Sequence, residues 1–181
     1  MASRIRLLVG LGNPGREHEG TRHNAGFWFA EAVVRAAGAA FANEARFQGR
    51  IARIDGDVRV LEPTTYMNLS GRAVGAVVRF YGLAAAEVLV VHDELDLKPG
   101  TIKLKFGGGN AGHNGLRDIA AQLGSGDFWR LRIGIGHPRD SEFPQQPVVD
   151  YVLRPPGREE RALIDAAIVR GVAAWSAIFF F

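Results

Sequence analysis

Short apolar runs alternate with longer amphipathic stretches along this chain of 181 residues. The short runs are continuous or alternate with polar residues. Both patterns are typical of strands, which we predict at 4–9, 47–54, 58–61, 87–91, 101–106 and 130–135. The longer stretches carry apolar side chains at helical spacing and predict helices at 25–37, 70–81, 116–123 and 157 to about 179. Residues 16–22 are polar without a period and predict a loop.

Turn and cap residues mark the boundaries of several of these elements. Asp55-Gly56-Asp57 separates two alternating segments and predicts a hairpin. Ser70 has the hydroxyl of a helix N-cap, and Gly82 ends the same helical stretch. Because strands and helices alternate, we predict an α/β fold over residues 1–181. It is a single domain with a mixed, mostly parallel sheet flanked by helices.

Composition restricts the classes of protein that remain. Apolar residues make up 47% of the chain, which is enough for a core, and the absence of cysteine excludes disulfides, thiolate metal sites and a cysteine nucleophile. The apolar run at the N-terminus is too short for a signal peptide. The last apolar run, residues 172–181, is far below the roughly 20 residues that span a bilayer. We therefore expect a soluble, cytoplasmic protein without a membrane partner.

The basic residues are unevenly distributed. Between Lys98 and Arg139 the chain has seven basic and two acidic residues, although its formal net charge is only +3. A basic region on a near-neutral body is typical of proteins that bind a polyanion, but charge alone equally fits a solvated face.

One motif suggests a chemistry that the rest of the chain does not support. Gly10 to Gly15 matches the G-x-G-x-x-G pattern of dinucleotide-binding proteins and directly follows a predicted strand. That pattern requires a helix at its third glycine to hold a pyrophosphate, whereas here the helix begins only near Asn24. We therefore do not expect a nicotinamide cofactor.

Histidines are the strongest candidates for catalysis. None of the five has the spacing of a zinc site, and no G-x-S-x-G elbow supplies a serine nucleophile. A histidine that acts on water, oriented by a carboxylate, remains. Two segments supply such a pair: His23 lies where a loop meets a helix, and Asp93 lies at the end of a buried strand. From composition alone, a capping or surface histidine is the favoured interpretation of His23.

Asparagines and glycines gather near the predicted strand ends. Asn13, Asn24, Asn68, Asn110 and Asn114 lie in or beside polar loops, where a carboxamide can hold a water or donate to an oxyanion. For any single asparagine, turn formation is the commoner role. Residues 103–115 combine lysines with a glycine-rich loop before a helix, which is a natural seat for phosphate.

Six motifs occur together in one order: GLGNPG, TRHNAG, PTTYMNLSG, HDELDL, KLKFGGGNAGHNGL and RLRIGIGHP. Over about residues 5–155 they resemble bacterial peptidyl-tRNA hydrolases. The resemblance implies a monomeric enzyme without cofactor or metal that cleaves the ester bond between a peptide and tRNA. Its partner is peptidyl-tRNA, and DNA is not a partner.

The same resemblance assigns roles to individual residues. It implies that His23 is the catalytic base and that Asp93 orients it. The substrate-binding residues that it implies are Asn13, His18, Met67, Asn68, His113 and Asn114. The positions that it implies for contact with tRNA phosphates are Lys103, Lys105 and Arg132.

The chain shows three departures from the family pattern. His18 replaces a usual tyrosine, Asn110-Ala111 replaces a usual His-Gly pair, and Ser141 occupies an often basic position. A non-catalytic RNA-binding protein on the same fold is the alternative function. The presence of His23 and Asp93 together favours the enzyme.

Overall fold

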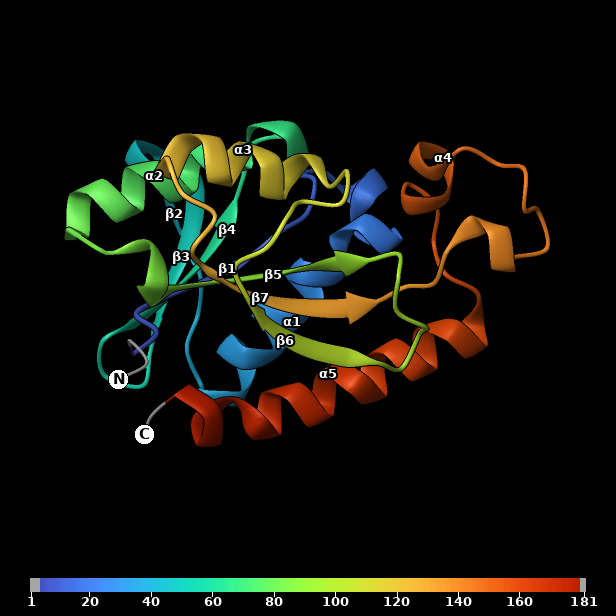
Figure 1. The fold of residues 1–181 in the computed structure, drawn as a ribbon. Coiled ribbons are helices and arrows are strands. Elements are labelled where there is room, and N and C mark those ends of the chain that lie inside the picture. The colour runs from blue at the N-terminus through green and yellow to red at the C-terminus, as the bar shows by residue number, and fades with distance from the viewer. Residues whose placement is uncertain (1–3, 180–181) are drawn as a thin grey trace.

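Seven strands form one mixed sheet in the computed structural model, which describes residues 4–179 (Figure 1). The strand order is β2-β3-β4-β1-β5-β7-β6. The central strands β4, β1, β5 and β7 are parallel, whereas β2, β3 and β6 are antiparallel to their neighbours. The strands are β1 (Leu7–Gly10), β2 (Ala42–Glu44), β3 (Gly49–Ile54), β4 (Val58–Pro63), β5 (Val88–Glu94), β6 (Ile102–Phe106) and β7 (Trp129–Gly134).

Helices cover both faces of the sheet. They are α1 (Ala25–Ala36), α2 (Ser70–Tyr81), α3 (Asn114–Leu123), α4 (Val148–Val152) and α5 (Arg158–Phe179). Figure 1 shows α2 and α3 on one face and α1 and α5 on the other. Two 3₁₀ turns also matter for the site: η2 (Arg22–Asn24) and η4 (Met67–Leu69). This architecture confirms the predicted α/β fold.

The two helical layers give two apolar clusters, one on each side of the sheet. One cluster joins α1 and α5 to the sheet, and the other joins α2 and α3 to it. Strands β1 and β5 lie between the clusters, so their apolar residues are buried on both faces. This explains their continuous apolar runs, which are typical of central parallel strands.

The structure differs from the predicted elements at several boundaries. Strand β2 and helix α4 were not predicted, and β1 begins at Leu7 rather than at residue 4. Residues 16–18, predicted as loop, form a 3₁₀ turn. The prediction that Ser70 caps α2 is wrong, because η4 runs directly into the helix and the Ser70 hydroxyl donates to the Met67 carbonyl at 2.7 Å. The final Phe180-Phe181 lies outside the described residues.

The direction of β6 determines how the glycine-rich loop reaches the ends of the parallel strands. Phe106, at the end of β6, pairs with Trp129 at the start of β7, so β6 ends at the edge opposite to the ends of the parallel strands. Residues 107–113 therefore cross back along the sheet before α3 begins (Figure 1). This return brings the glycine-rich loop to the edge where β1, β4, β5 and β7 end, the usual place for a site in such sheets.

Among the described residues, no helix combines the length and the apolar character that a membrane span requires.

Candidate active site

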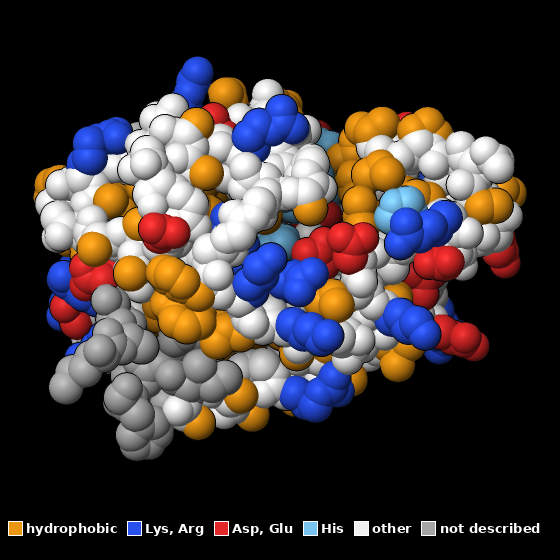
Figure 2. All heavy atoms as spheres, viewed as in Figure 1, with side chains coloured by type: hydrophobic (Ala, Val, Ile, Leu, Met, Phe, Trp, Pro, Cys, Tyr) orange, Lys and Arg blue, Asp and Glu red, His pale blue; other side chains and the backbone are white. Residues whose placement is uncertain are grey.

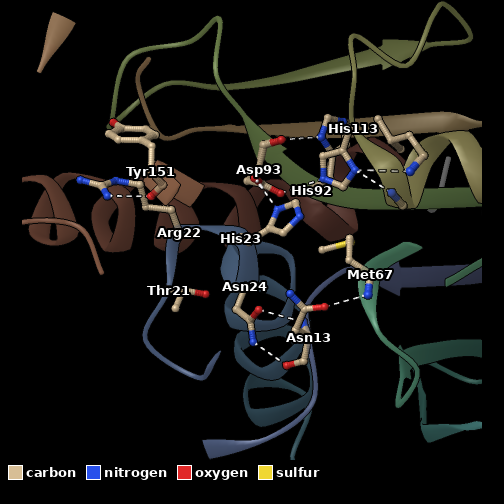
Figure 3. A network of polar contacts seen from close by, with 12 residues as sticks. Asn13, Thr21, Arg22, His23, Asn24, Met67, His92, Asp93, His113 and Tyr151 are labelled. Carbon is tan, nitrogen blue, oxygen red and sulfur yellow. Dashed lines mark hydrogen bonds and ion pairs between the residues drawn. The ribbon is translucent and has the colours of Figure 1, made fainter. Parts of the chain in front are cut away.

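Two histidines from different parts of the chain converge on one buried carboxylate, Asp93. His23 Nδ1 lies 2.8 Å from Asp93 Oδ2, and His113 Nε2 lies 2.8 Å from Oδ1 (Figure 3). Asp93 is near the end of β5, His23 is in η2, and His113 directly precedes α3. One carboxylate therefore orients both imidazole rings, whose centroids are 5.1 Å apart.

Hydrogen-bond partners determine the tautomers of these rings. The Nδ1 atom of His113 accepts from the backbone N–H groups of Gly115 and Leu116, so its Nε2 carries the proton and donates to Asp93. In the neutral ring, His23 donates from Nδ1 to the same carboxylate. Its Nε2 is then unprotonated and can accept a proton from a reacting group.

The charge of Asp93 governs the protonation of His23. Burial lowers the pKa of His23, but the charge and the hydrogen bond of Asp93 outweigh it, so the pKa lies above its usual value. Burial also raises the pKa of Asp93, but His23 and His113 lower it by more, so the group stays ionised. A neighbouring anion stabilises an imidazolium, which is what a general base becomes when it takes a proton.

A third histidine packs behind this pair. His92 is buried, its ring contacts the ring of His113 edge-on at 5.2 Å, and its Nδ1 donates to the Asp93 carbonyl. Burial, together with the nearby His113, lowers the pKa of His92 to about 4. His92 is therefore neutral near pH 7 and supports the site without competing for its protons.

A close approach of backbones places His23 at the ends of the strands. Gly26 lies in the first turn of α1, and a Cβ there would collide with the Val91 carbonyl and the backbone of Leu11. Only glycine permits α1 to begin directly against β1 and β5. Because η2 immediately precedes α1, this contact brings His23 next to Asp93.

Asn13 joins three segments beside the same histidine. Its backbone N–H donates to Asn24 Oδ1 at 2.8 Å, and Asn24 Nδ2 donates back to the Asn13 carbonyl at 3.0 Å. The side-chain oxygen of Asn13 accepts from the Met67 N–H at 2.7 Å. The loop after β1, η2 and η4 are thus held together, and Figure 3 shows the Asn13 amide nitrogen on the side of His23.

These groups lie in a cleft of about 1050 Å³. Its lining includes Asn13, Met67, Asn68, His113 and Asn114, five of the six substrate-binding residues predicted from the sequence. Asn68 and Asn114 are exposed, and the Asn114 oxygen accepts from Arg117 at 2.9 Å. His18 does not line the cleft, and its ring lies beside Glu17.

The two sides of the cleft differ in polarity. Figure 2 shows a hollow with histidine side chains at its floor, hydrophobic atoms over α4 on one side and Lys and Arg atoms along another. Val148, Val149, Val152 and Leu153 of the α4 segment line the apolar side. This wall was not predicted, because the mostly apolar segment 148–153 after Pro147 is too short to show a helical period.

The basic side comes from β6 and β7. Lys103 pairs with Arg132 and Lys105 with Arg130 in the antiparallel register, so all four side chains lie on one face of the sheet. Lys105, Arg130 and Arg132 line the cleft, whereas Lys103 lies outside its lining. Arg132 is held by Glu94 at 2.8 Å, and Arg130 is buried against backbone carbonyls, so Lys105 is the more exposed cation.

Comparison with known proteins shows the family to which the chain belongs. A family model described as peptidyl-tRNA hydrolase matches residues 7–180. The chain belongs to the peptidyl-tRNA hydrolase family. It is 61% identical over 167 residues to the peptidyl-tRNA hydrolase of Thiobacillus denitrificans, with 92% of this chain and 80% of that protein covered. Identity to the peptidyl-tRNA hydrolase of Aromatoleum aromaticum is 56%, covering 98% of this chain and 89% of that protein.

Solved structures of peptidyl-tRNA hydrolases share the fold. The crystal structure of the peptidyl-tRNA hydrolase from Acinetobacter baumannii superimposes with a TM-score of 0.91 and 45% sequence identity. The match covers 99% of this chain and 91% of that one. The family and the fold expected from the six motifs are therefore confirmed.

Within this peptidyl-tRNA hydrolase fold, His23, Asp93 and His113 also form the one group of residues 4–179 whose ligand atoms lie close enough to suggest a metal site. Their N···O contacts of 2.8 Å have the length of hydrogen bonds. A bound cation would have to displace the ring proton of each histidine. It would also have to move the histidines away from Asp93, because metal–ligand bonds of about 2.0–2.2 Å at tetrahedral angles hold their ligand atoms farther apart than 2.8 Å. The arrangement therefore suits proton transfer.

Proposed function

We propose that this chain hydrolyses the ester bond between the peptide and the tRNA of peptidyl-tRNA, with His23 as the general base. The observation that carries the proposal is the 2.8 Å contact between His23 Nδ1 and a buried, ionised Asp93 in the cleft of a peptidyl-tRNA hydrolase fold. It leaves Nε2 to take a proton from water as that water attacks the ester carbonyl. Asp93 stabilises the imidazolium that forms.

The carboxamides of the cleft supply the other requirement of ester hydrolysis. The attack places negative charge on the carbonyl oxygen, and an uncharged N–H donor stabilises that charge without repelling the imidazolium that forms on His23. The Asn13 nitrogen faces the His23 side, and Asn68 is exposed on the same cleft. We assign oxyanion stabilisation and water binding to these asparagines, and substrate contact to Asn114.

The polarity of the cleft orients the substrate. Lys105 and Arg132, with Lys103 beside them, contact tRNA phosphates, which are recognised by charge rather than by base sequence. The apolar side formed by α4 receives the peptide. Activity across many tRNAs and a strong dependence on salt concentration follow from this arrangement.

The test is release of the acyl group from an N-acetylated aminoacyl-tRNA by the wild type and by His23→Ala. We expect the variant to lose about 10²- to 10⁴-fold in kcat while still binding tRNA, since only the base is removed. Near-normal turnover by His23→Ala would refute the mechanism. If the wild type binds tRNA but does not release the acyl group, the RNA-binding alternative is favoured instead.

We further propose that the protein acts as a monomer in the cytoplasm, where peptidyl-tRNA is produced. The cleft is complete within one chain, because His23, Asp93 and both sides of the cavity come from the same copy. Light scattering during size exclusion tests this at the concentration of the activity assay. A stable dimer would contradict it.

A further inference from the structure

Arg22 is a buried arginine that precedes His23 and points away from it. Its side chain lies against Tyr151, with the guanidinium carbon 3.9 Å from the ring centroid (Figure 3). Nη1 donates to the Tyr151 carbonyl at 3.0 Å and approaches the Arg154 carbonyl at 3.4 Å. Nη2 pairs with Glu160 at 3.6 Å. The carbonyls that accept from this side chain therefore lie in or just after α4, and its ion-pair partner lies in the first turn of α5.

These contacts lie at the C-terminal end of the short helix α4. The last carbonyls of a helix have no partner within it, and a cation near them is favourable. Helix α4 has only five residues, so it has little stability of its own. The backbone N–H of Arg22 also donates to the Arg154 carbonyl at 3.1 Å. The turn that carries His23 thus holds the C-terminal end of α4.

Tyr151 provides the second point of attachment. Its hydroxyl donates to the Ile135 carbonyl at 2.7 Å, just after β7, while its ring supports the Arg22 guanidinium. The neighbours of Tyr151 on α4 make no comparable polar contact. Val149 is 60% exposed, yet it lines the cleft. Val152 of the same helix is buried beside Tyr151, so Arg22 and Tyr151 set the position of the apolar wall together with the packing of Val152.

We infer that Arg22 is a positioning residue that sets the distance between the α4 wall and His23, and with it the peptide side chains that the cleft accepts. The inference rests on the proposed function, because it takes the peptide to be the part of the substrate that meets the wall. His23 itself is held by Asp93 and by the Asn13–Asn24 pair. Loss of the Arg22 side chain should therefore weaken binding of the peptide without disabling the base.

The test compares Arg22→Gln with the wild type on two substrates, N-acetyl-phenylalanyl-tRNA and N-acetyl-glycyl-tRNA. If α4 occupies its bound position about a tenth of the time in the variant, KM for the phenylalanyl substrate rises about tenfold. We expect KM for the glycyl substrate and kcat for both to change less than about twofold, because glycine has no side chain to meet the wall. The pH profile of kcat should be unchanged.

Two further variants separate positioning from general damage. Arg22→Lys keeps a charge for Glu160 but lacks the planar fork and the stacking surface, so it should recover only part of the KM. Arg161→Gln is the matched control, because Arg161 also stacks on a ring, that of Trp28, and pairs with Asp165, and both of these partners lie outside α4. We expect wild-type KM values from it.

The outcomes distinguish this inference from the proposed function. A fall in kcat with a shifted pH profile in Arg22→Gln would show that Arg22 acts on His23 and would overturn the inference. Equal KM changes on both substrates, or none, would also overturn it. If the wild type itself releases no acyl group, the proposed function fails first. If Arg22→Gln does not fold, Arg22→Lys and Tyr151→Phe carry the test, with the same selective rise in KM expected.

Discussion

Replacing Asp93 with asparagine tests the role of the carboxylate with almost no change in shape. Asp93 accepts one N–H from His23 and one from His113. Asparagine can accept at its oxygen but presents an NH₂ group at the other position. One of the two histidines must therefore face a donor instead of an acceptor.

The cap of α3 decides which histidine that is. His113 Nδ1 accepts from the N–H groups of Gly115 and Leu116, so its Nε2 must keep the proton. That Nε2–H will therefore donate to the oxygen of the new amide. The NH₂ group then faces His23, whose Nδ1 has to become an acceptor. Its proton moves to Nε2, the atom that should accept a proton from water.

We therefore expect Asp93→Asn to lose about 10³- to 10⁴-fold in kcat, close to the loss that the same exchange causes in a Ser-His-Asp triad. That loss corresponds to about 4–5.5 kcal/mol of barrier. The assay is acyl release from N-acetylated aminoacyl-tRNA, with the thermal midpoint Tm as a check on folding. Without the carboxylate, burial alone acts on the pKa of His23 and lowers it, so the residual activity should persist to lower pH than in the wild type.

A double variant tests the reasoning about tautomers. Adding His113→Ala to Asp93→Asn frees the amide to rotate, so its oxygen can face His23 and restore the active tautomer. We expect the double variant to be more active than Asp93→Asn alone. Equal or lower activity would refute the tautomer argument, and kcat within tenfold of the wild type in the single variant would refute the role of the carboxylate.

Three further variants test other features of the structure. Burial, with the neighbouring Glu31, raises the pKa of Glu62 to about 8 from 4.5, so the folded chain binds a proton that the unfolded chain releases. The free energy of unfolding should therefore fall by up to a few kcal/mol as the pH rises from about 4.5 to about 8. Urea titrations of Glu62→Gln should lack that fall. Equal pH dependence in both proteins would contradict this prediction. Ala111 has a φ of 48°, in the left-handed region that favours glycine. Ala111→Gly should therefore raise the free energy of unfolding, measured in urea, by about 0.5–1 kcal/mol. A loss of stability would show that the backbone at Ala111 is not strained. Lys105→Ala should reduce the slope of log tRNA affinity against log salt concentration by about 1. Arg53→Ala on the distant strand β3 is the control. An unchanged slope in Lys105→Ala would show that Lys105 does not contact tRNA.

Local sequence patterns predicted most of the fold. The helices at α1, α2 and α5 and the hairpin of β3 and β4 follow from periodicity and turn residues, which act over a few positions. The short elements β2 and α4 carried no such signal, because three and five residues are too few to show a period. The Ser70 cap failed for a related reason: the preceding turn replaced the cap, and only the folded chain shows that turn.

The sequence by itself determined the family of this protein and the residues available for its chemistry. His23, Asp93 and the asparagines could be named from their motifs because those motifs occur together in one order. Only the tertiary structure decided how they act. The antiparallel direction of β6 returns His113 to Asp93, which fixes the tautomer of His113, while His23 Nδ1 contacts the other oxygen of Asp93 and leaves its Nε2 free to accept a proton. Arg22 likewise meets Tyr151, which lies 129 positions later in the chain. Such contacts depend on sheet register and helix packing, which no local pattern encodes.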